Sequence, residues 1–120
     1  MKKGILLILA LSLTACSHVA MLPYLVSSNP HQDISESAKR GKILFAENCA
    51  TCHGINATGN GELSASLAKA PVNLASIYKD KSLKVFVAET MVGKGEYMPA
   101  FKDTLKSEQA WDLANYVASL

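Results

Sequence analysis

The first fifteen residues are the most apolar part of the chain. Lys2 and Lys3 precede an apolar stretch that runs to Ala15 and is followed by Cys16. A basic start, a short apolar stretch and small residues before a break are typical of a secretory signal peptide. A membrane-spanning helix needs about 20 apolar residues, so this stretch is too short to predict a transmembrane anchor. We therefore expect a signal peptide over residues 1–15 and a mature chain that starts at Cys16.

Helical periodicity begins near residue 33. Over residues 33–48 an apolar stripe repeats every three to four positions and includes Gly41 and Phe45. Asp33 and Glu36 have the spacing of a capping box, and Ser35 is an alternative N-cap. A glycine inside a helix costs about 1 kcal/mol relative to alanine. Gly41 on the apolar stripe therefore predicts the close approach of another helix.

Two further segments show the helical period. Residues 82–92 can be capped by Ser82 and ended by Gly93, and residues 107–120 can be capped by Ser107. Their apolar positions are Leu83, Phe86, Val87, Met91, Ala110, Leu113, Ala114, Val117 and Leu120, with Trp111 and Tyr116 as further core residues. Over residues 54–81 we expect mostly loop, with short helical turns around 62–69. No segment shows sustained alternation of apolar and polar positions, so the pattern predicts an all-α fold with about three main helices.

Length and charge narrow the classes of function. The chain has 120 residues and a formal net charge of +2, which allows one small domain. Loss of Lys2 and Lys3 with the signal peptide leaves ten basic and ten acidic residues, so the mature chain is formally neutral. Binding to phosphates needs a clustered basic surface, and we therefore expect no nucleic-acid partner.

Two of the three cysteines form the motif Cys49-Ala-Thr-Cys52, which is followed directly by His53. The cysteine pair alone is compatible with a short-loop disulfide, a redox dithiol or half of a zinc site. The adjacent histidine favours another interpretation, because Cys-x-x-Cys-His is the attachment pattern of a c-type haem. Two thiols three positions apart lie on nearly one side of a helical turn and can add to the two vinyl groups of a porphyrin. We expect Cys49 and Cys52 to bind one haem covalently and His53 to be the proximal iron ligand.

The motif and later segments carry a family resemblance. The segments Cys49–Gly54, Gly59–Gly61 and Tyr97–Phe101, together with Pro71, resemble a small class I monohaem cytochrome c. The resemblance covers residues 35–120. It implies a small all-α cytochrome c fold whose helices and loops wrap around one haem, with His and Met as axial ligands. It also implies an electron-carrying role.

The second axial ligand is predicted to be Met98. Its rivals are other methionines and histidines of the mature chain, namely Met21, Met91, His18 and His31. Met98 lies in a glycine-containing loop, where a thioether can point inward without disturbing a helix, and Pro99 fixes the local backbone. Tyr97-Met98-Pro99 also resembles the distal Met-Pro motif of the family. By the same resemblance, the carbonyl of Pro71 accepts a hydrogen bond from His53.

Leu13-Thr14-Ala15-Cys16 resembles the lipobox of bacterial lipoproteins, in which the cysteine receives the lipid. This implies that Cys16 anchors the protein on the periplasmic side of a membrane. Ser17 in place of an aspartate favours the outer membrane, if the host has one. Residues 16–34 would then be a tether before a domain at residues 35–120. The apolar part of this tether, Met21 to Val26, could lie on lipid, pack on the domain or mark a docking site.

These features predict a membrane-tethered electron carrier rather than an enzyme. An iron held by His and Met has no open position for oxygen or peroxide, and a Met ligand raises the reduction potential. We expect a protein donor and a protein acceptor as redox partners, and either a monomer or a subunit of a respiratory complex. Two alternatives stay open. One is a haem-based sensor, which needs Met98 off the iron, and the other is a fixed subunit through which electrons enter a larger oxidoreductase.

Overall fold

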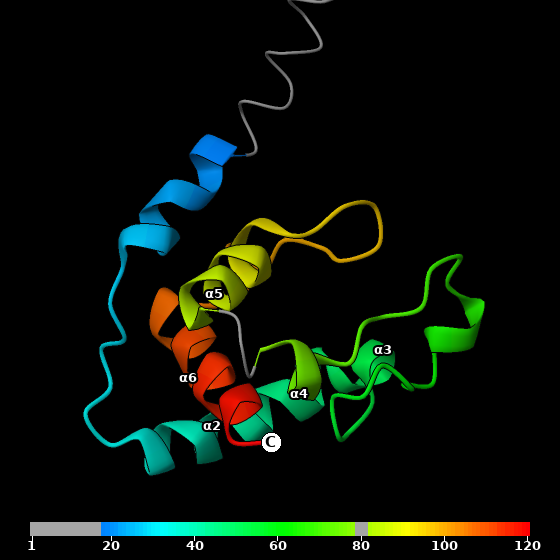
Figure 1. Ribbon diagram of the computed structural model, residues 1–120, viewed down its shortest axis with the longest axis horizontal. Coiled ribbons are helices and arrows are strands. Elements are labelled where there is room, and N and C mark those ends of the chain that lie inside the picture. Colours follow the sequence, from blue (N-terminus) through cyan, green and yellow to red (C-terminus); the bar gives the residue numbers. More distant parts are fainter. Residues whose placement is uncertain (1–17, 79–81) are drawn as a thin grey trace, which may run out of the picture.

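The computed structural model describes residues 18–78 and 82–120 (Figure 1). Its elements, in chain order, are α2 (Ile34–Asn48), α3 (Ala50–His53), the 3-10 helix η1 (Ser64–Ser66), α4 (Leu74–Ile77), α5 (Leu83–Val92) and α6 (Ser107–Ala118). Residues 18–26 are also helical. In the described part of the chain the only β pairing is an isolated antiparallel bridge between Lys94 and Met98. The prediction of an all-α fold with three main helices is confirmed.

The N-terminus of α2 is capped by Asp33. Its Oδ1 accepts a hydrogen bond from the backbone N–H of Glu36 at 3.0 Å, which satisfies one of the free donors of the first turn. Asp33 is therefore the N-cap, and the alternative at Ser35 is wrong, because Ser35 already lies inside the helix.

The two later helices begin close to their predicted caps. The side chain of Ser82 accepts a hydrogen bond from the N–H of Lys84 and caps α5, as predicted. The prediction for Ser107 is wrong by one position, because α6 begins at Ser107 and Lys106 is its N-cap. The N–H of Lys106 donates to Oε1 of Gln109 at 2.9 Å, so the glutamine side chain satisfies the free N–H of the N-cap residue.

Helices α2 and α6 cross at Gly41. A Cβ at this position would lie 2.0 Å from the backbone oxygen of Asp112 and 2.9 Å from Cβ of Tyr116. No side chain fits into that space, so the glycine allows the two backbones to touch. The predicted close approach is confirmed. One turn later on α2, Phe45 packs against Tyr116 with ring centroids 5.4 Å apart.

A polar network closes the α2–α6 crossing. The carboxylate of Asp112, only 6% exposed, accepts hydrogen bonds from Ser37 Oγ at 2.6 Å and from Arg40 Nε and Nη2 at 3.1 and 2.8 Å. Asn115 Nδ2 donates in turn to Ser37 Oγ at 2.8 Å. A buried carboxylate is tolerated here because both of its oxygens are hydrogen-bonded.

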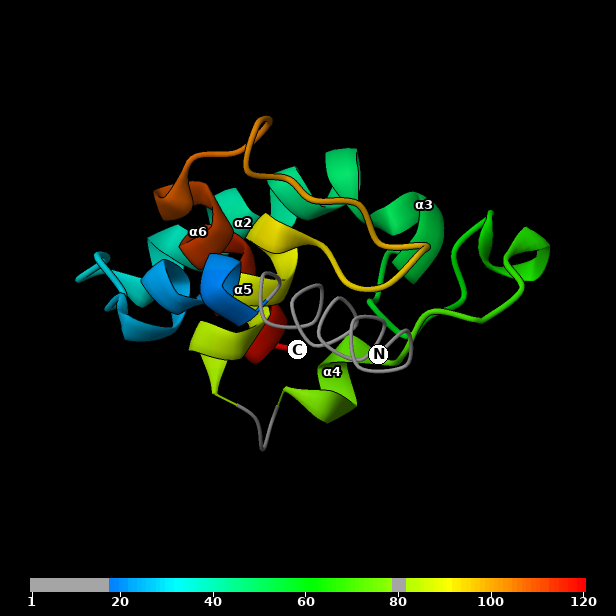
Figure 2. The same cartoon turned by 90° about the horizontal axis from the view of Figure 1, so that it is seen from above.

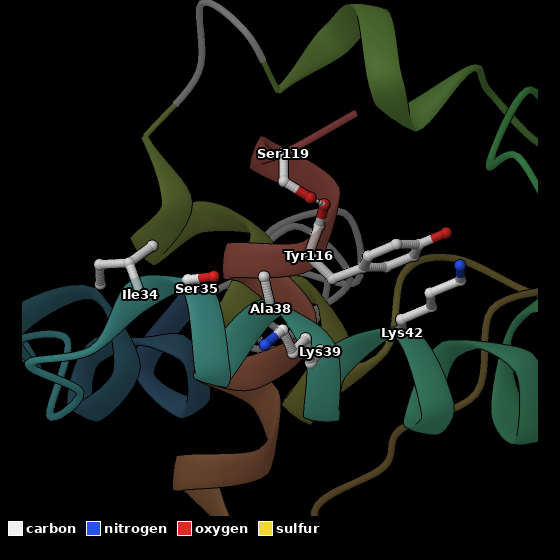
Figure 3. Close-up of a pocket in the computed structure, with 7 residues that line it drawn as sticks. All are labelled: Ile34, Ser35, Ala38, Lys39, Lys42, Tyr116 and Ser119. Atoms are coloured by element: carbon white, nitrogen blue, oxygen red, sulfur yellow. Dashed lines mark hydrogen bonds between the residues drawn. The ribbon is translucent and has the colours of Figure 1, made fainter.

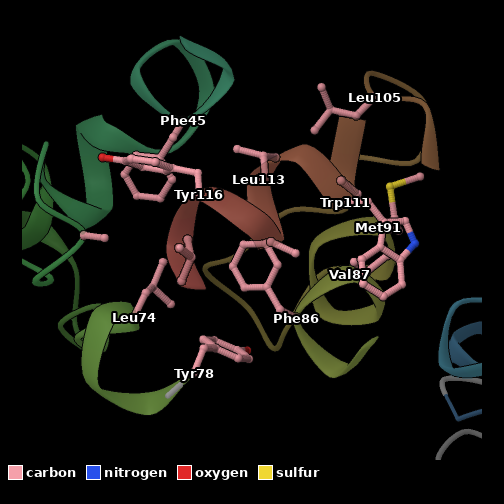
Figure 4. Packing of buried hydrophobic residues seen from close by; sticks show 14 residues of the cluster. Phe45, Leu74, Tyr78, Phe86, Val87, Met91, Leu105, Trp111, Leu113 and Tyr116 are labelled. Carbon is pink, nitrogen blue, oxygen red and sulfur yellow. The ribbon is translucent and has the colours of Figure 1, made fainter. Parts of the chain in front are cut away.

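The apolar core is formed mainly by α2, α5 and α6, with a contribution from α4 (Figure 4). Its largest members are Phe45, Leu74, Tyr78, Phe86, Val87, Met91, Leu105, Trp111, Leu113 and Tyr116. Trp111 and Tyr116 are buried, which confirms their predicted role in packing. The ring of Tyr78, at the end of α4, meets Phe86 of α5 edge to face at 5.0 Å. The short helix α4 was not predicted, whereas η1 lies within the predicted turns of residues 62–69.

Candidate functional site

Cys49, Cys52 and His53 lie on one helical turn at the junction of α2 and α3. The carbonyl of Cys49 accepts the N–H groups of both Cys52, at 3.2 Å, and His53, at 2.9 Å. Both cysteines are half-buried free thiols. The structure therefore brings the two predicted attachment residues and the predicted proximal ligand together, as the motif requires.

The loop over residues 54–63 wraps around the C-terminal end of α3. Each of three successive carbonyls accepts one loop N–H: Thr51 from Leu63 at 2.9 Å, Cys52 from Gly61 at 3.1 Å and His53 from Gly59 at 2.8 Å. These bonds satisfy carbonyls that a helix otherwise leaves free at its C-terminus. A Cβ at Gly61 would lie 2.4 Å from the Thr51 oxygen, so only glycine allows this approach. The loop thereby holds the Cys–His turn in one conformation.

The imidazole of His53 is held between the core and the following loops. Phe45 packs beside it, with ring centroids 6.5 Å apart and planes tilted by 56°. Burial lowers the pKa of His53, and the backbone of Val72 partly opposes this shift. The buried Nδ1 atom forms no hydrogen bond with any described residue. Burial therefore favours the neutral imidazole, which is the form that binds metals.

Pro71 lies directly against the loop that follows His53. Its carbonyl oxygen is 2.3 Å from the position that a Cβ at Gly59 would take. The N–H of Leu74 donates to the carbonyl of Ala57 at 2.8 Å and so joins the two segments. No hydrogen bond connects His53 Nδ1 with Pro71 in the described structure. The acceptor role of Pro71 stays a prediction.

Met98 lies half-buried in the loop between α5 and α6. Its carbonyl accepts the N–H of Lys94 at 3.0 Å and closes a short loop over residues 94–98. Two further backbone bonds, each 3.1 Å long, return the chain to the end of α5: Phe101 to Thr90 and Lys102 to Met91. In both views this loop extends toward the end of the long axis at which α3 lies (Figures 1 and 2). The backbone that carries Met98 is therefore fixed on both sides.

Glu89, on α5, joins the Met98 loop to α4 and was not predicted from the sequence. Its carboxylate, 15% exposed, accepts hydrogen bonds from Tyr78 Oη and from Lys94 Nζ, the latter at 2.6 Å. Burial, together with the hydrogen bond to Glu89, raises the pKa of Tyr78. The sequence signal for this cluster is only the spacing of Glu89 and Lys94 across the helix end, which is too common to identify a site.

Cys49 does not have the environment of a redox-active thiol. Burial, reinforced by the neighbouring Cys52, raises the pKa of Cys49 to about 12. Redox-active cysteines instead have lowered pKa values, since the thiolate is the reactive form. Among residues 18–78 and 82–120, no group of three or more His, Cys, Asp and Glu side chains could hold a metal ion. The turn thus offers two thiols and one imidazole, the donor set of a haem c attachment site.

Two rivals of Met98 have other partners. Met91 is 3% exposed and lies in the apolar core. His31 Nδ1 lies 3.3 Å from Nη2 of Arg40, and its Nε2 lies 3.0 Å from Oδ1 of Asp112. The remaining rivals, His18 and Met21, lie in the helical segment 18–26. The assignment of Met98 as the second ligand stays a prediction.

A surface hollow of about 580 Å³ lies elsewhere, between α2 and the end of α6 (Figure 3). It is lined by Ile34, Ser35, Ala38, Lys39, Lys42, Tyr116 and Ser119. None of the predicted haem-binding residues lines it, so it is separate from the Cys–His turn.

The predicted signal peptide over residues 1–15 and the predicted lipid site at Cys16 lie outside the described residues. Within the described ranges, no helix has both the length and the apolar character needed to cross a membrane. Both assignments stay predictions.

Comparison with known proteins shows the family. The model of the cytochrome c family matches residues 38–120. The chain is 36% identical over 83 residues to cytochrome c6 of Leptolyngbya boryana, which covers 69% of this chain and 91% of that protein. It is 29% identical over 97 residues to the cbb3-type cytochrome c oxidase subunit CcoP of Azospirillum brasilense, covering 81% of this chain and 33% of that subunit. It is also 37% identical over 86 residues to the oxidase subunit FixP of Azorhizobium caulinodans, covering 70% and 27%.

The chain thus spans about a third or less of the length of these oxidase subunits, and most of the length of cytochrome c6. The matched region contains the Cys–His turn, the Met98 loop and all of α5 and α6. The family resemblance and the predicted fold are therefore confirmed. On the evidence of its fold, its Cys–His turn and this match, the chain belongs to the cytochrome c family, in class I.

Proposed function

We propose that this cytochrome carries single electrons between two redox proteins through one haem, bound covalently by Cys49 and Cys52 and ligated by His53 and Met98. The observation that carries the proposal is the α3 turn, which presents two free thiols and a half-buried imidazole side by side. The half-buried Met98 on a fixed loop supplies the second ligand.

The described residues fit a c-type haem. The only buried side-chain polar atoms without a hydrogen-bond partner in the described residues are His53 Nδ1 and Thr90 Oγ1. His53 Nδ1 is the donor predicted for the Pro71 carbonyl, which would leave Nε2 for the iron, and the carbonyl of Thr90 anchors the end of the Met98 loop. The flanking loops also present large apolar side chains that are 45–47% exposed, at Leu63, Val72 and Tyr97. Such side chains suit the apolar faces of a porphyrin.

The chain's own residues would hold the group and its ligands still. When bound, the haem supplies the one-electron chemistry. Phe45 packs beside His53 and restrains the imidazole, and the Lys94–Met98 backbone bond restrains the loop of the thioether. Two protein ligands leave no coordination position for oxygen or peroxide. A coordination sphere that changes little between oxidation states favours outer-sphere electron transfer.

The location of the protein forms a separate part of the proposal. Residues 1–15 act as a signal peptide, and Cys16 carries a lipid that holds the domain on the periplasmic side of a bacterial membrane, the outer membrane where the host has one. The support is the lipobox resemblance of residues 13–16 together with the short apolar stretch before it.

A second candidate function is that of a fixed subunit through which electrons enter a terminal oxidase. It is favoured by the CcoP and FixP relatives, which are subunits of cbb3-type cytochrome c oxidases and match 69–81% of this chain. Co-purification with an oxidase after mild detergent extraction would favour the subunit. Recovery as an independent lipoprotein would favour the shuttle.

The ligand set can be tested by replacing Met98→Ala beside a matched methionine control. We expect the ferric wild-type protein to show the red thioether-to-iron charge-transfer band, to titrate as one reversible one-electron couple and to bind no CO when reduced. Met98→Ala should lose the band, lower the potential and bind CO, whereas the volume-conserving Met91→Leu in the core should change none of these. An unchanged band and potential in Met98→Ala would refute the assignment, and ready CO binding by the wild type would favour a haem-based sensor.

A further inference from the structure

Residues 18–32, here called the strap, lie against the cytochrome domain. The strap is a helix over residues 18–26 followed by an extended segment, and it runs beside α5 and α6 (Figures 1 and 2). Tyr24 packs against the apolar core. Asn29 Nδ2 donates to Asn115 Oδ1 at 2.9 Å, and His31 Nε2 lies 3.0 Å from both the Glu108 carbonyl and Asp112 Oδ1. The strap is therefore fixed to the domain by one core contact and by three polar contacts to α6.

The strap helix has a second apolar face, which points away from the domain. Val19, Leu22 and Val26 are 67%, 59% and 72% exposed. Their spacing of three and four positions places them on one side of the helix. Met21 and Leu25 are half-buried, as is Tyr24, and these residues lie on the other side. One face of the helix thus packs on the domain while an aliphatic stripe stays uncovered.

The strap also carries no Asp, Glu, Lys or Arg. The first charged residue after Cys16 is Asp33. A helix with an aliphatic face lies in the bilayer interface with its apolar side in the acyl boundary. The composition of the strap therefore suits contact with lipid.

The short distance along the chain between Cys16 and the aliphatic stripe indicates that the stripe contacts the membrane. Val19 is three residues beyond Cys16. Three extended residues span at most about 11 Å. A lipid on Cys16 places its acyl chains in the bilayer, so Val19 cannot lie farther than this from the membrane surface. The N-terminal end of the stripe is thus held within reach of the interface, and Leu22 and Val26 lie there too when the helix axis runs along the membrane.

We propose that the strap lies on the lipid surface with Val19, Leu22 and Val26 in the interface, while its opposite face clamps the cytochrome domain in one orientation. The inference rests on the proposed lipid at Cys16. The strap and α3 lie at opposite ends of the long axis in both views (Figures 1 and 2). The end of the domain that carries the Cys–His turn is therefore held away from the strap, where it can meet redox partners in the aqueous phase.

The experiment uses the mature holoprotein in vesicles of phosphatidylethanolamine and phosphatidylglycerol. With Cys16 acylated and Cys49 and Cys52 bound to haem, Leu22→Cys introduces the only free thiol, which can carry a nitroxide. Power-saturation EPR of the ferrous, diamagnetic protein then gives the depth of the label. We expect the Leu22→Cys label about 5–10 Å below the headgroup boundary, the depth of an interfacial helix.

Two matched labels serve as controls. Ile43→Cys on α2 replaces an aliphatic side chain that is 62% exposed, similar to Leu22, and Ala65→Cys lies on η1 at the far end of the molecule. Both labels should report an aqueous environment. A Leu22→Cys label as accessible to water as the Ile43→Cys label would overturn the interfacial strap, and an Ala65→Cys label in the membrane would overturn the single orientation.

The intact mass of the same samples separates this inference from the proposed anchor. An acylated Cys16 with an aqueous Leu22→Cys label refutes the strap inference and leaves the anchor standing. A membrane-embedded Leu22→Cys label without acylation refutes the anchor and supports the strap. Loss of both the acyl group and the interfacial depth refutes both.

Discussion

The α2–α6 crossing and the haem end of the molecule, which comprises α3 with residues 54–74 and 93–101, are built in different ways. At the crossing, two backbones touch at Gly41, and the buried Asp112 has a partner for each oxygen. Two buried side-chain polar atoms of the described residues lack a hydrogen-bond partner. One, His53 Nδ1, lies in the haem end, and the other, Thr90 Oγ1, lies next to it on α5. The haem end also exposes large apolar side chains such as Leu63 and Tyr97.

The difference shows which part of the fold the chain completes by itself. At the crossing, side chains of the chain itself satisfy the buried polar groups and fill the space between the helices. The crossing therefore forms a framework that needs no other group to be complete. The haem end satisfies its backbone through the loop around α3, but its imidazole and its apolar loop side chains are suited to a further group. The cytochrome thus combines a self-sufficient framework with a site that a prosthetic group completes.

The largest expected effect on the free energy of unfolding comes from adding a side chain at Gly41, where α2 and α6 cross. Gly41→Val places atoms where the Asp112 backbone oxygen lies, so we expect it to lower the free energy of unfolding by about 3 kcal/mol or more. The matched change at the haem end is Gly95→Ala, where φ is +64° and nothing lies within 4 Å of the new Cβ. It should cost only the backbone strain of about 1–2 kcal/mol. Urea unfolding of the two holoproteins measures this, and equal costs would contradict the framework.

A smaller effect is expected from the polar network. Asp112→Ala removes the acceptor of Ser37 and Arg40, and leaves buried hydroxyl and amide groups at the crossing without part of their network. We expect a loss of about 2 kcal/mol in the free energy of unfolding. The spectrum and potential of the haem should not change. Glu36→Ala, which removes an exposed pair with Lys39, is the control and should have no measurable effect on unfolding.

These particular residues also show what could be predicted from the sequence. Regular helical spacing located α2, α5 and α6, and the cost of a helical glycine indicated the contact at Gly41 before any partner was known. The Cys–His turn was found because its chemistry depends on residues adjacent in sequence. The Tyr78–Glu89 contact and the partners of Asp112 were not found, since these contacts join residues 11 to 75 positions apart and leave no local pattern.

The smallest expected effect concerns pH and the Tyr78–Glu89 contact beside the Met98 loop. Burial and this hydrogen bond raise the pKa of Tyr78 above its usual value of about 10. A raised pKa in the folded state stabilises the protein below the unfolded pKa, and this stabilisation is lost as the pH rises above about 10, because only the unfolded tyrosine ionises there.

Tyr78→Phe should therefore reduce the fall in the free energy of unfolding between about pH 9 and about pH 11, by roughly 1 kcal/mol. Urea titrations at the two pH values check this, with Tyr97→Phe on the exposed side of the Met98 loop as the control. An identical pH dependence in Tyr78→Phe and the wild type would show that the contact is not linked to stability.

The most direct test of a haem-completed site is the mass of one peptide. Tryptic cleavage after Lys42 and Lys69 releases residues 43–69, which contain both Cys49 and Cys52. From the mature protein we predict that this peptide carries the added mass of one haem and has no free thiol. A peptide 43–69 without haem, with two free thiols or a disulfide, would contradict the central claim.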